Sequence, residues 1–221
     1  DNGTIEYLGY TKVEIPAENI YTGSLAVIND EHEAKGIFMS MTSLAEVKNE
    51  YYTLRNDDMI FNIEASAALN SMMEAYNSET GKSNFVVYNT TETYNEEDAV
   101  YTAEYPEALS GYSLDLAILS KSGNFIEYDG LDNESWIIEN CHNYGFIVRY
   151  ESDKTEITGN KASVYHLRYV GKVHSAIMHE KDLCLEEYLD FIRPYMIDTQ
   201  KFNYTLDGCE YEIYYTSANI D

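Results

Sequence analysis

Apolar residues in this chain never run for more than four positions in succession, as at residues 25–28. A transmembrane helix needs about 20 mainly apolar residues, so the sequence excludes a membrane span and the core of a signal peptide. Hydrophobic residues still make up 44% of the 221 positions, which is enough for a buried core and argues against general disorder. The chain is therefore expected to be globular.

The charge is strongly negative, with 39 Asp and Glu against 14 Lys and Arg and a formal net charge of −25. So few basic residues cannot form the positive stripe that binds a phosphate backbone, so nucleic acid is excluded as a partner. The sequence begins at Asp1 rather than Met, which suggests that a leader or membrane anchor was removed.

Periodicity predicts helices and strands mixed along the chain. A helix is predicted over residues 64–76, where apolar side chains recur at three- and four-residue spacing, and another over residues 135–141, ending near Gly145. A third is predicted over residues 183–192, before Pro194. Strands are predicted at residues 25–28, 82–88, 114–119, 146–150 and 165–169.

The C-terminal segment predicts a β-hairpin. Asp207-Gly208 lies between residues 202–206 and 209–215, and a two-residue Asp-Gly loop favours the positive φ values of a type I′ turn. Strands and helices without strict alternation indicate an α+β fold with a central, mostly antiparallel sheet and packed helices. Residues 1–195 are predicted to form a single domain, with residues 196–221 as a hairpin extension packed on it.

The three cysteines, Cys141, Cys184 and Cys209, lie far apart and show no CxxC spacing. That spacing argues against a zinc ribbon or a thioredoxin-like site. An odd number leaves at least one thiol unpaired, so three buried structural cysteines are predicted rather than a disulfide framework.

Four segments of the second half stand in a distinctive order: WIIENCHNYGFIVRY at 136–150, ITG at 157–159, YHLRYVG at 165–171 and LEEYL at 185–189. The chain resembles VanY-type D-alanyl-D-alanine carboxypeptidases, which carry similar segments in the same order. Residues 21–32 resemble that family's first strand, so the resemblance covers about residues 20–195. It implies a hedgehog-like metallopeptidase fold and a zinc hydrolase that acts on peptidoglycan stem peptides outside the cytoplasmic membrane.

The resemblance also implies a metal site, which this sequence retains only in part. In the family, zinc is held by the His and Asp of an SxHxxGxAxD motif and by the His of an ExxH motif, whose Glu is the general base. Three protein ligands leave zinc an open position for water and lower the pKa of that water towards about 7. ExxH aligns with residues 163–166, so His166 keeps the ligand position while Ser163 replaces the base.

The other motif aligns best with residues 108–117, which places Ser110 at the first His and Ala117 at the Asp. No His lies between residues 32 and 142, and Asp115 is the only local substitute for the missing carboxylate. The family's carboxylate-binding Arg, in an SGYRS-like strand end, aligns with Thr91.

The sequence therefore predicts a non-catalytic, extracytoplasmic member of this family that needs no cofactor and binds a peptidoglycan peptide or a cell-envelope protein. The alternative is an active zinc D,D-carboxypeptidase with an atypical metal site. The predicted cleft residues are Ser110, Tyr112, Asp115, Tyr165, His166 and Arg168.

Overall fold

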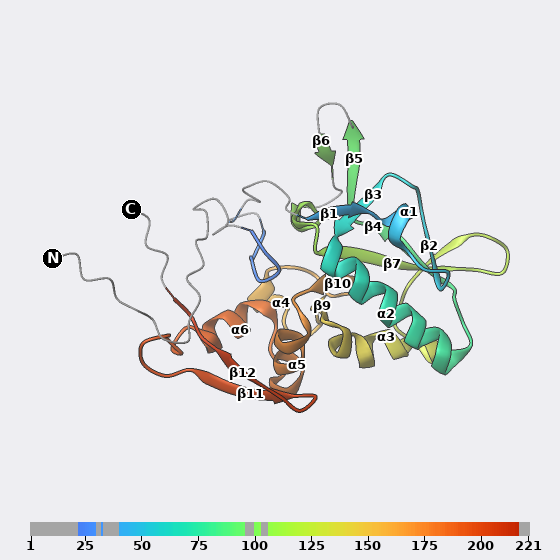
Figure 1. Ribbon diagram of the computed structural model, residues 1–221. Coiled ribbons are helices and arrows are strands. Elements are labelled where there is room, and N and C mark those ends of the chain that lie inside the picture. Colours follow the sequence, from blue (N-terminus) through green and yellow to red (C-terminus); the bar gives the residue numbers. More distant parts are fainter. Residues whose placement is uncertain (1–21, 30–31, 33–39, 96–99, 103–105, 217–221) are drawn as a thin grey trace.

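The computed structural model describes residues 22–29, 32, 40–95, 100–102 and 106–216 (Figure 1). Its centre is a six-stranded sheet with the order β2-β4-β7-β10-β9, in which β8 also pairs with β7. Only β2 and β4 are parallel, and the other pairs of this sheet in the described residues are antiparallel. The strands are β2 (Tyr52–Leu54), β4 (Phe85–Asn89), β7 (Ser113–Leu119), β8 (Phe125–Glu127), β9 (Phe146–Tyr150) and β10 (Ser163–Tyr169). The predicted α+β fold with a mostly antiparallel sheet is confirmed.

A smaller sheet contains β5, the strand that comes directly after β4 in the chain. Its four strands have the order β1-β3-β5-β6 and comprise Met41–Ser43, Met59–Asn62, Thr91–Asn95 and Val100–Thr102. The helices are α1 (Leu44–Val47), α2 (Ile63–Thr80), α3 (Ser135–Asn140), α4 (Thr155–Thr158), α5 (Lys172–Lys181) and α6 (Leu185–Ile192). Short 3₁₀ turns lie at η2 (Pro106–Ser110), η3 (Asp132–Glu134) and η4 (Cys141–Tyr144).

Helices α2 and α3 lie on the same side of the central sheet (Figure 1). The Asn62 side chain caps α2 by accepting hydrogen bonds from two backbone N–H groups, and Gly81 ends the helix at a φ of 70°. The spacing that predicted this helix also gives it a buried stripe, which includes Leu69 and Tyr76. These side chains pack with Phe146 and other sheet residues in one apolar core.

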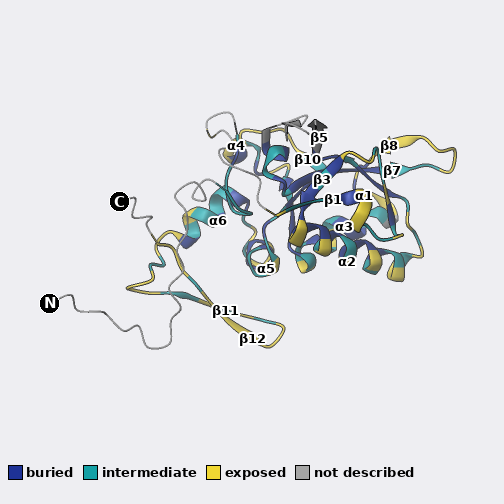
Figure 2. Cartoon of the chain, turned by 45° about the horizontal axis from the view of Figure 1, so that its top comes forward, coloured by how far each residue is buried: buried dark blue, intermediate teal, exposed yellow. Residues whose placement is uncertain are grey.

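A second apolar cluster joins the sheet edge to α5 and α6 through Ile147, Ile177 and Tyr188. The C-terminal hairpin, β11 (Phe202–Leu206) and β12 (Cys209–Ile213), packs on this cluster, with the Phe202 and Phe191 rings 5.1 Å apart. Asp207 and Gly208 have φ values of 51° and 78°, as the Asp-Gly prediction requires. Much of the remaining hairpin surface is exposed (Figure 2).

Two predictions about local structure are wrong. Residues 25–28 form no strand, and the backbone carbonyls of Ala26 and of the preceding Ser24 accept hydrogen bonds from the Arg168 guanidinium. Cys209 is exposed on the hairpin, whereas Cys141 and Cys184 are buried as predicted, and all three thiols are free. None of the helices in the described part of the chain is long and apolar enough to cross a membrane.

Candidate functional site

The register of β10 against β7 brings the main polar side chains together. His166 lies opposite Asp115, and Arg168 lies opposite Ser113. Because side chains two positions apart in a strand share a face, His166 and Arg168 extend to the same side of the sheet. The 3₁₀ turn η2 places Glu107 over this pair of strands, within contact of both side chains.

The His166 imidazole is held between two carboxylates. Its Nδ1 lies 2.7 Å from Asp115 Oδ1, and its Nε2 lies 2.9 Å from Glu107 Oε2. The Tyr150 ring stacks on the imidazole with centroids 5.0 Å apart. His166 is only 3% exposed, so these contacts form away from bulk water.

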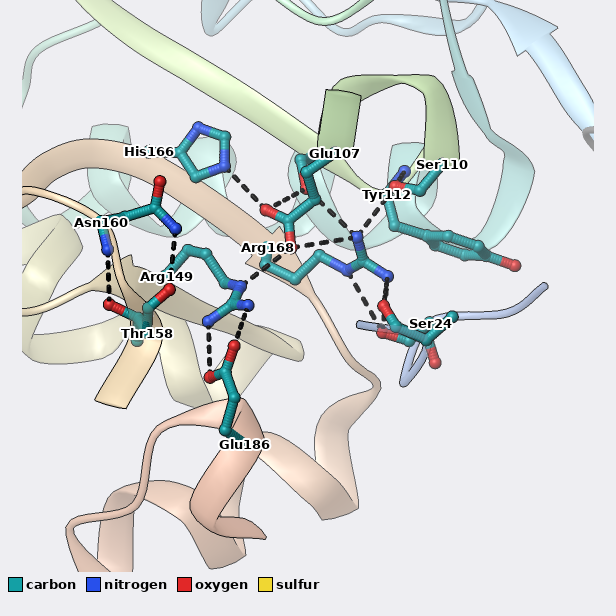
Figure 3. A network of polar contacts seen from close by, with 12 residues as sticks. Ser24, Glu107, Ser110, Tyr112, Arg149, Thr158, Asn160, His166, Arg168 and Glu186 are labelled. Carbon is teal, nitrogen blue, oxygen red and sulfur yellow. Dashed lines mark hydrogen bonds and ion pairs between the residues drawn. The ribbon is translucent and has the colours of Figure 1, made fainter. Parts of the chain in front are cut away.

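Glu107 is the centre of a buried ionic cluster (Figure 3). Its Oε1 accepts a hydrogen bond of 2.8 Å from Arg149 Nε, on β9, and lies 3.5 Å from Arg168 Nη1. Arg149 also donates to both carboxylate oxygens of Glu186, at the start of α6, over 2.9 and 2.5 Å. The cluster therefore ties the sheet to η2 and to α6.

Arg168 anchors the segment at residues 22–29. Its guanidinium donates to the backbone carbonyls of Ser24 and Ala26 over 3.1 and 3.0 Å, and to Ser110 Oγ over 2.9 Å. The residue is fully buried. The segment that resembled a family strand is thus held by carbonyl contacts with a buried cation.

The charges balance when His166 is protonated: Glu107, Asp115 and Glu186 carry three negative charges, and Arg149, Arg168 and His166 carry three positive ones. Burial alone would raise the pKa of Glu107, but Arg168, the hydrogen bond from His166, and Arg149 hold it well below its ordinary value. Burial would lower the pKa of His166, yet the hydrogen bonds with Asp115 and Glu107 raise it. The two carboxylates thus outweigh the effect of burial and shift His166 towards its protonated form.

A cavity of about 620 Å³ opens beside His166. One wall is formed by residues 156–161, around α4, and the polar residues on the opposite side come from η2, β7 and β10. Four residues singled out from the sequence line it, namely Asp115, Ser163, Tyr165 and His166.

The other predicted cleft residues lie elsewhere. Arg168 donates a hydrogen bond to Ser110, and neither residue is among those that line the cavity. Tyr112 stacks on Tyr169, with centroids 6.3 Å apart, and its hydroxyl accepts a hydrogen bond from Asn62. These three side chains stabilise the scaffold around the site.

The position of Asp115 favours an alignment of the SxHxxGxAxD motif that is shifted by two residues. Ala117 was aligned with the metal-binding Asp, but the carboxylate beside His166 belongs to Asp115. Counting SxHxxGxAxD back from Asp115 places the motif's Gly on Gly111 and its first His on Ala108 instead of Ser110. Ala108 is fully buried, and its carbonyl accepts a hydrogen bond from Thr91, the residue aligned with the family's Arg.

Three members of the cluster, Glu107, Arg149 and Glu186, were missed in the sequence. Arg149 is the one member whose position in the sequence indicates a buried ion pair, because a charge in the apolar strand FIVRY needs a buried partner. Nothing in the sequence identifies which two of 39 acidic residues provide that partner.

Comparisons with known proteins agree on one family. The family model described as "VanY: D-alanyl-D-alanine carboxypeptidase" matches residues 51–172. A D-alanyl-D-alanine carboxypeptidase of Enterococcus faecium is 32% identical over 215 residues, which cover 91% of this chain and 67% of that protein.

Solved structures extend the similarity. The vancomycin-resistance D,D-dipeptidase VanXYg, in complex with a D-Ala-D-Ala phosphinate analog, is 26% identical with a TM-score of 0.73 over 91% of this chain and 84% of that one. VanYB in complex with D-alanine-D-alanine is 23% identical and shares the fold, with a TM-score of 0.52 over 76% of this chain and 97% of that one.

Proposed function

Since the chain belongs to the VanY family of D-alanyl-D-alanine carboxypeptidases, we propose that it is a non-catalytic member that binds a peptidoglycan stem peptide in the cavity beside His166. The observation that carries this proposal is the geometry around His166. Each of its ring nitrogens lies within 3 Å of a carboxylate oxygen, in a cluster whose charges balance when the ring is protonated.

These residues do not fit a three-ligand zinc site. Both ring nitrogens of His166 already face a carboxylate oxygen, Nδ1 that of Asp115 and Nε2 that of Glu107, so neither nitrogen is left open towards a metal ion. Glu107 is already neutralised by Arg149, and Ala108, at the motif's first His position, has no donor atom. Zinc affinity comes from several ligands acting together, so a site reduced to His166 and Asp115 would not retain the ion. Among the described residues, no group of three or more His, Cys, Asp or Glu side chains is arranged to hold a metal ion.

The general base is absent from its position as well. Ser163 stands where the ExxH motif has Glu, and a serine hydroxyl does not accept a proton near neutral pH. Its Oγ is buried and has no hydrogen-bond partner in the described residues. Nothing on this stretch of β10 can therefore activate a water molecule.

Peptide binding does not need the lost groups. The cavity is large enough for a dipeptide and is lined by aromatic, aliphatic and polar groups, including Tyr165, Ile157 and Asn160. The related VanXYg structure contains a D-Ala-D-Ala analog. The stem peptides of cell-wall peptidoglycan lie outside the cytoplasmic membrane, so we infer that the protein acts there. A cell-envelope protein is the other candidate ligand.

The test combines metal content, turnover and binding. Protein purified without chelator is expected to hold less than about 0.1 zinc per chain and to release no D-alanine from acetyl-L-Lys-D-Ala-D-Ala. Calorimetry should detect binding of this peptide, weakened by Tyr165→Ala but not by Tyr211→Ala, a control on the hairpin. Stoichiometric zinc, together with D-alanine release that His166→Gln abolishes, would instead establish an atypical zinc carboxypeptidase.

A further inference from the structure

One wall of the cavity beside His166 comes from the segment at residues 22–29. Ile28 and Asn29 line that cavity, and Ile28 is only 5% exposed. Ile28 and Ile157 are the aliphatic side chains among the described lining residues, and Ile157, on α4, is 48% exposed. An apolar group of a ligand can therefore pack on side chains from two segments that lie far apart in the sequence.

Strand pairing does not hold this segment in place. The described residues 22–29 belong to no helix or strand. Instead, the Arg168 guanidinium donates to three of their backbone carbonyls, those of Gly23, Ser24 and Ala26, over 3.3, 3.1 and 3.0 Å. A planar guanidinium can engage several carbonyls at once, because its five N–H groups diverge from one rigid plane. The apolar side chains of the segment pack beside the second apolar cluster, namely Leu25 and Val27.

The same guanidinium contacts the ionic cluster at the cavity. Arg168 Nη1 lies 3.5 Å from Glu107 Oε1, and Glu107 Oε2 lies 2.9 Å from His166 Nε2. Figure 3 shows Arg168 between Glu107 and Ser24. Glu107 and His166 line the cavity, whereas Arg168 does not. Arg168 therefore sets the position of the segment relative to His166 without lining the cavity itself.

We propose that residues 22–29 act as a clamp on the ligand of this cavity, with Ile28 as a ligand contact and Arg168 as the positioning residue. The inference rests on the proposed function, because it requires a peptide beside His166. A ligand that contacts both Ile28 and His166 joins the segment to the sheet, as Arg168 does. Binding of the ligand and docking of the segment therefore stabilise each other.

The first part of the experiment tests the ligand contact. Acetyl-L-Lys-D-Ala-D-Ala is titrated into the full chain and its variants, and binding is measured by calorimetry. Ile28→Ala should weaken binding about fourfold for each methylene lost from the contact. Ile137→Ala is the matched control, because it makes the same change at a fully buried position in the other apolar core. It should lower stability and keep the wild-type affinity.

The second part tests the anchor. Arg168→Lys keeps a cation beside Glu107 but cannot reach all three carbonyls, so binding should weaken about tenfold. Gly23→Ala disturbs the same anchor from the segment and leaves the buried cluster intact. Gly23 has a φ of 105°, which strains any residue with a Cβ, and no described atom lies within 4 Å of that Cβ position. It should weaken binding about threefold, whereas Gly123→Ala, at a φ of 84° with equally open space, should not change it.

Hydrogen exchange separates a clamp from a merely structural segment. In the wild type, saturating peptide should slow exchange of the backbone amides of residues 22–29, as measured by mass spectrometry. Arg168→Lys should reduce this protection. A segment that only supports the fold would show no protection that depends on the peptide.

The failures are distinguishable. If the wild type binds no peptide, the proposed function fails and this inference fails with it. If the wild type binds the peptide but Ile28→Ala and Gly23→Ala bind it equally well, the clamp is wrong while the proposed function stands. Equal weakening by Ile28→Ala and Ile137→Ala would assign the effect to lost stability and would also overturn the clamp.

Discussion

The two faces of the central sheet are stabilised in different ways. On the face covered by α2 and α3, the buried side chains are almost all apolar, and Phe146, Leu69 and Tyr76 belong to one continuous core. On the other face, buried Glu107, Arg149 and related groups form an ionic cluster. An apolar core tolerates rearrangement of its contacts, whereas a buried charge depends on its particular partners. The ionic face should therefore be the more sensitive to single substitutions.

The largest loss is expected from Arg149→Ala. The substitution removes the 2.8 Å ion pair between Arg149 and buried Glu107 and also releases Glu186, so the free energy of unfolding should fall by about 5 kcal/mol, the upper end of the range for a broken buried ion pair. Urea unfolding followed by circular dichroism measures the change. Arg193→Ala, which removes an exposed pair with Asp190, is the control and should change stability by less than about 0.5 kcal/mol. If both variants lowered the free energy of unfolding by the same amount, the buried cluster would contribute no more to stability than an exposed ion pair.

On the apolar face, Phe146→Ala should lower the free energy of unfolding by about 4 kcal/mol, through lost transfer energy and the cavity that remains. Phe125→Ala is the matched control, because Phe125 is 45% exposed and should cost less than about 1 kcal/mol. The same urea titrations apply. A change below about 1 kcal/mol for Phe146→Ala would contradict its place in the core.

The same contrast explains what could be predicted from the sequence. Helix α2 and strands β9 and β10 were predicted because their periodicity is local and survives any tertiary arrangement. Half of the ionic cluster was not, because Glu107, Arg149 and Glu186 come from η2, β9 and α6, and their proximity depends on the tertiary arrangement. A two-residue shift on β7 keeps a side chain on the same face, so the pattern alone could not separate Asp115 from Ala117.

A stacked pair of histidines, one from η4 and one from α5, gives a pH-dependent test. The His142 and His179 rings stack with centroids 3.5 Å apart, and burial, followed by the neighbouring His179, lowers the pKa of His142. The unfolded state, with a pKa near 6.5, therefore binds more protons than the folded state, and stability should fall as pH drops through this value.

His142→Asn should make the decrease in unfolding free energy between pH 7 and pH 5 less steep. Glu151, Asp182 and His179 line the small cavity beside His142, and they are common to both proteins, so the comparison isolates the His142 contribution. Parallel stability curves for wild type and variant, from urea titrations at each pH, would show that His142 does not titrate differently on folding.

The smallest effect is expected at an exposed ion pair, which completes the contrast with the buried cluster. Lys172 donates to Asp207 over 2.6 Å, but the two side chains are 54% and 67% exposed, so water and salt screen the attraction. Asp207 also has a φ of 51°, which Asn adopts readily, so Asp207→Asn removes the charge without straining the hairpin turn. Urea unfolding should show a change below about 0.5 kcal/mol, and raising the salt concentration should reduce it further.

Glu107→Gln removes one carboxylate charge in the same way, but from a side chain that is only 2% exposed and contacts both Arg149 and His166. If both variants lost the same stability, burial would not be what separates the two ionic regions.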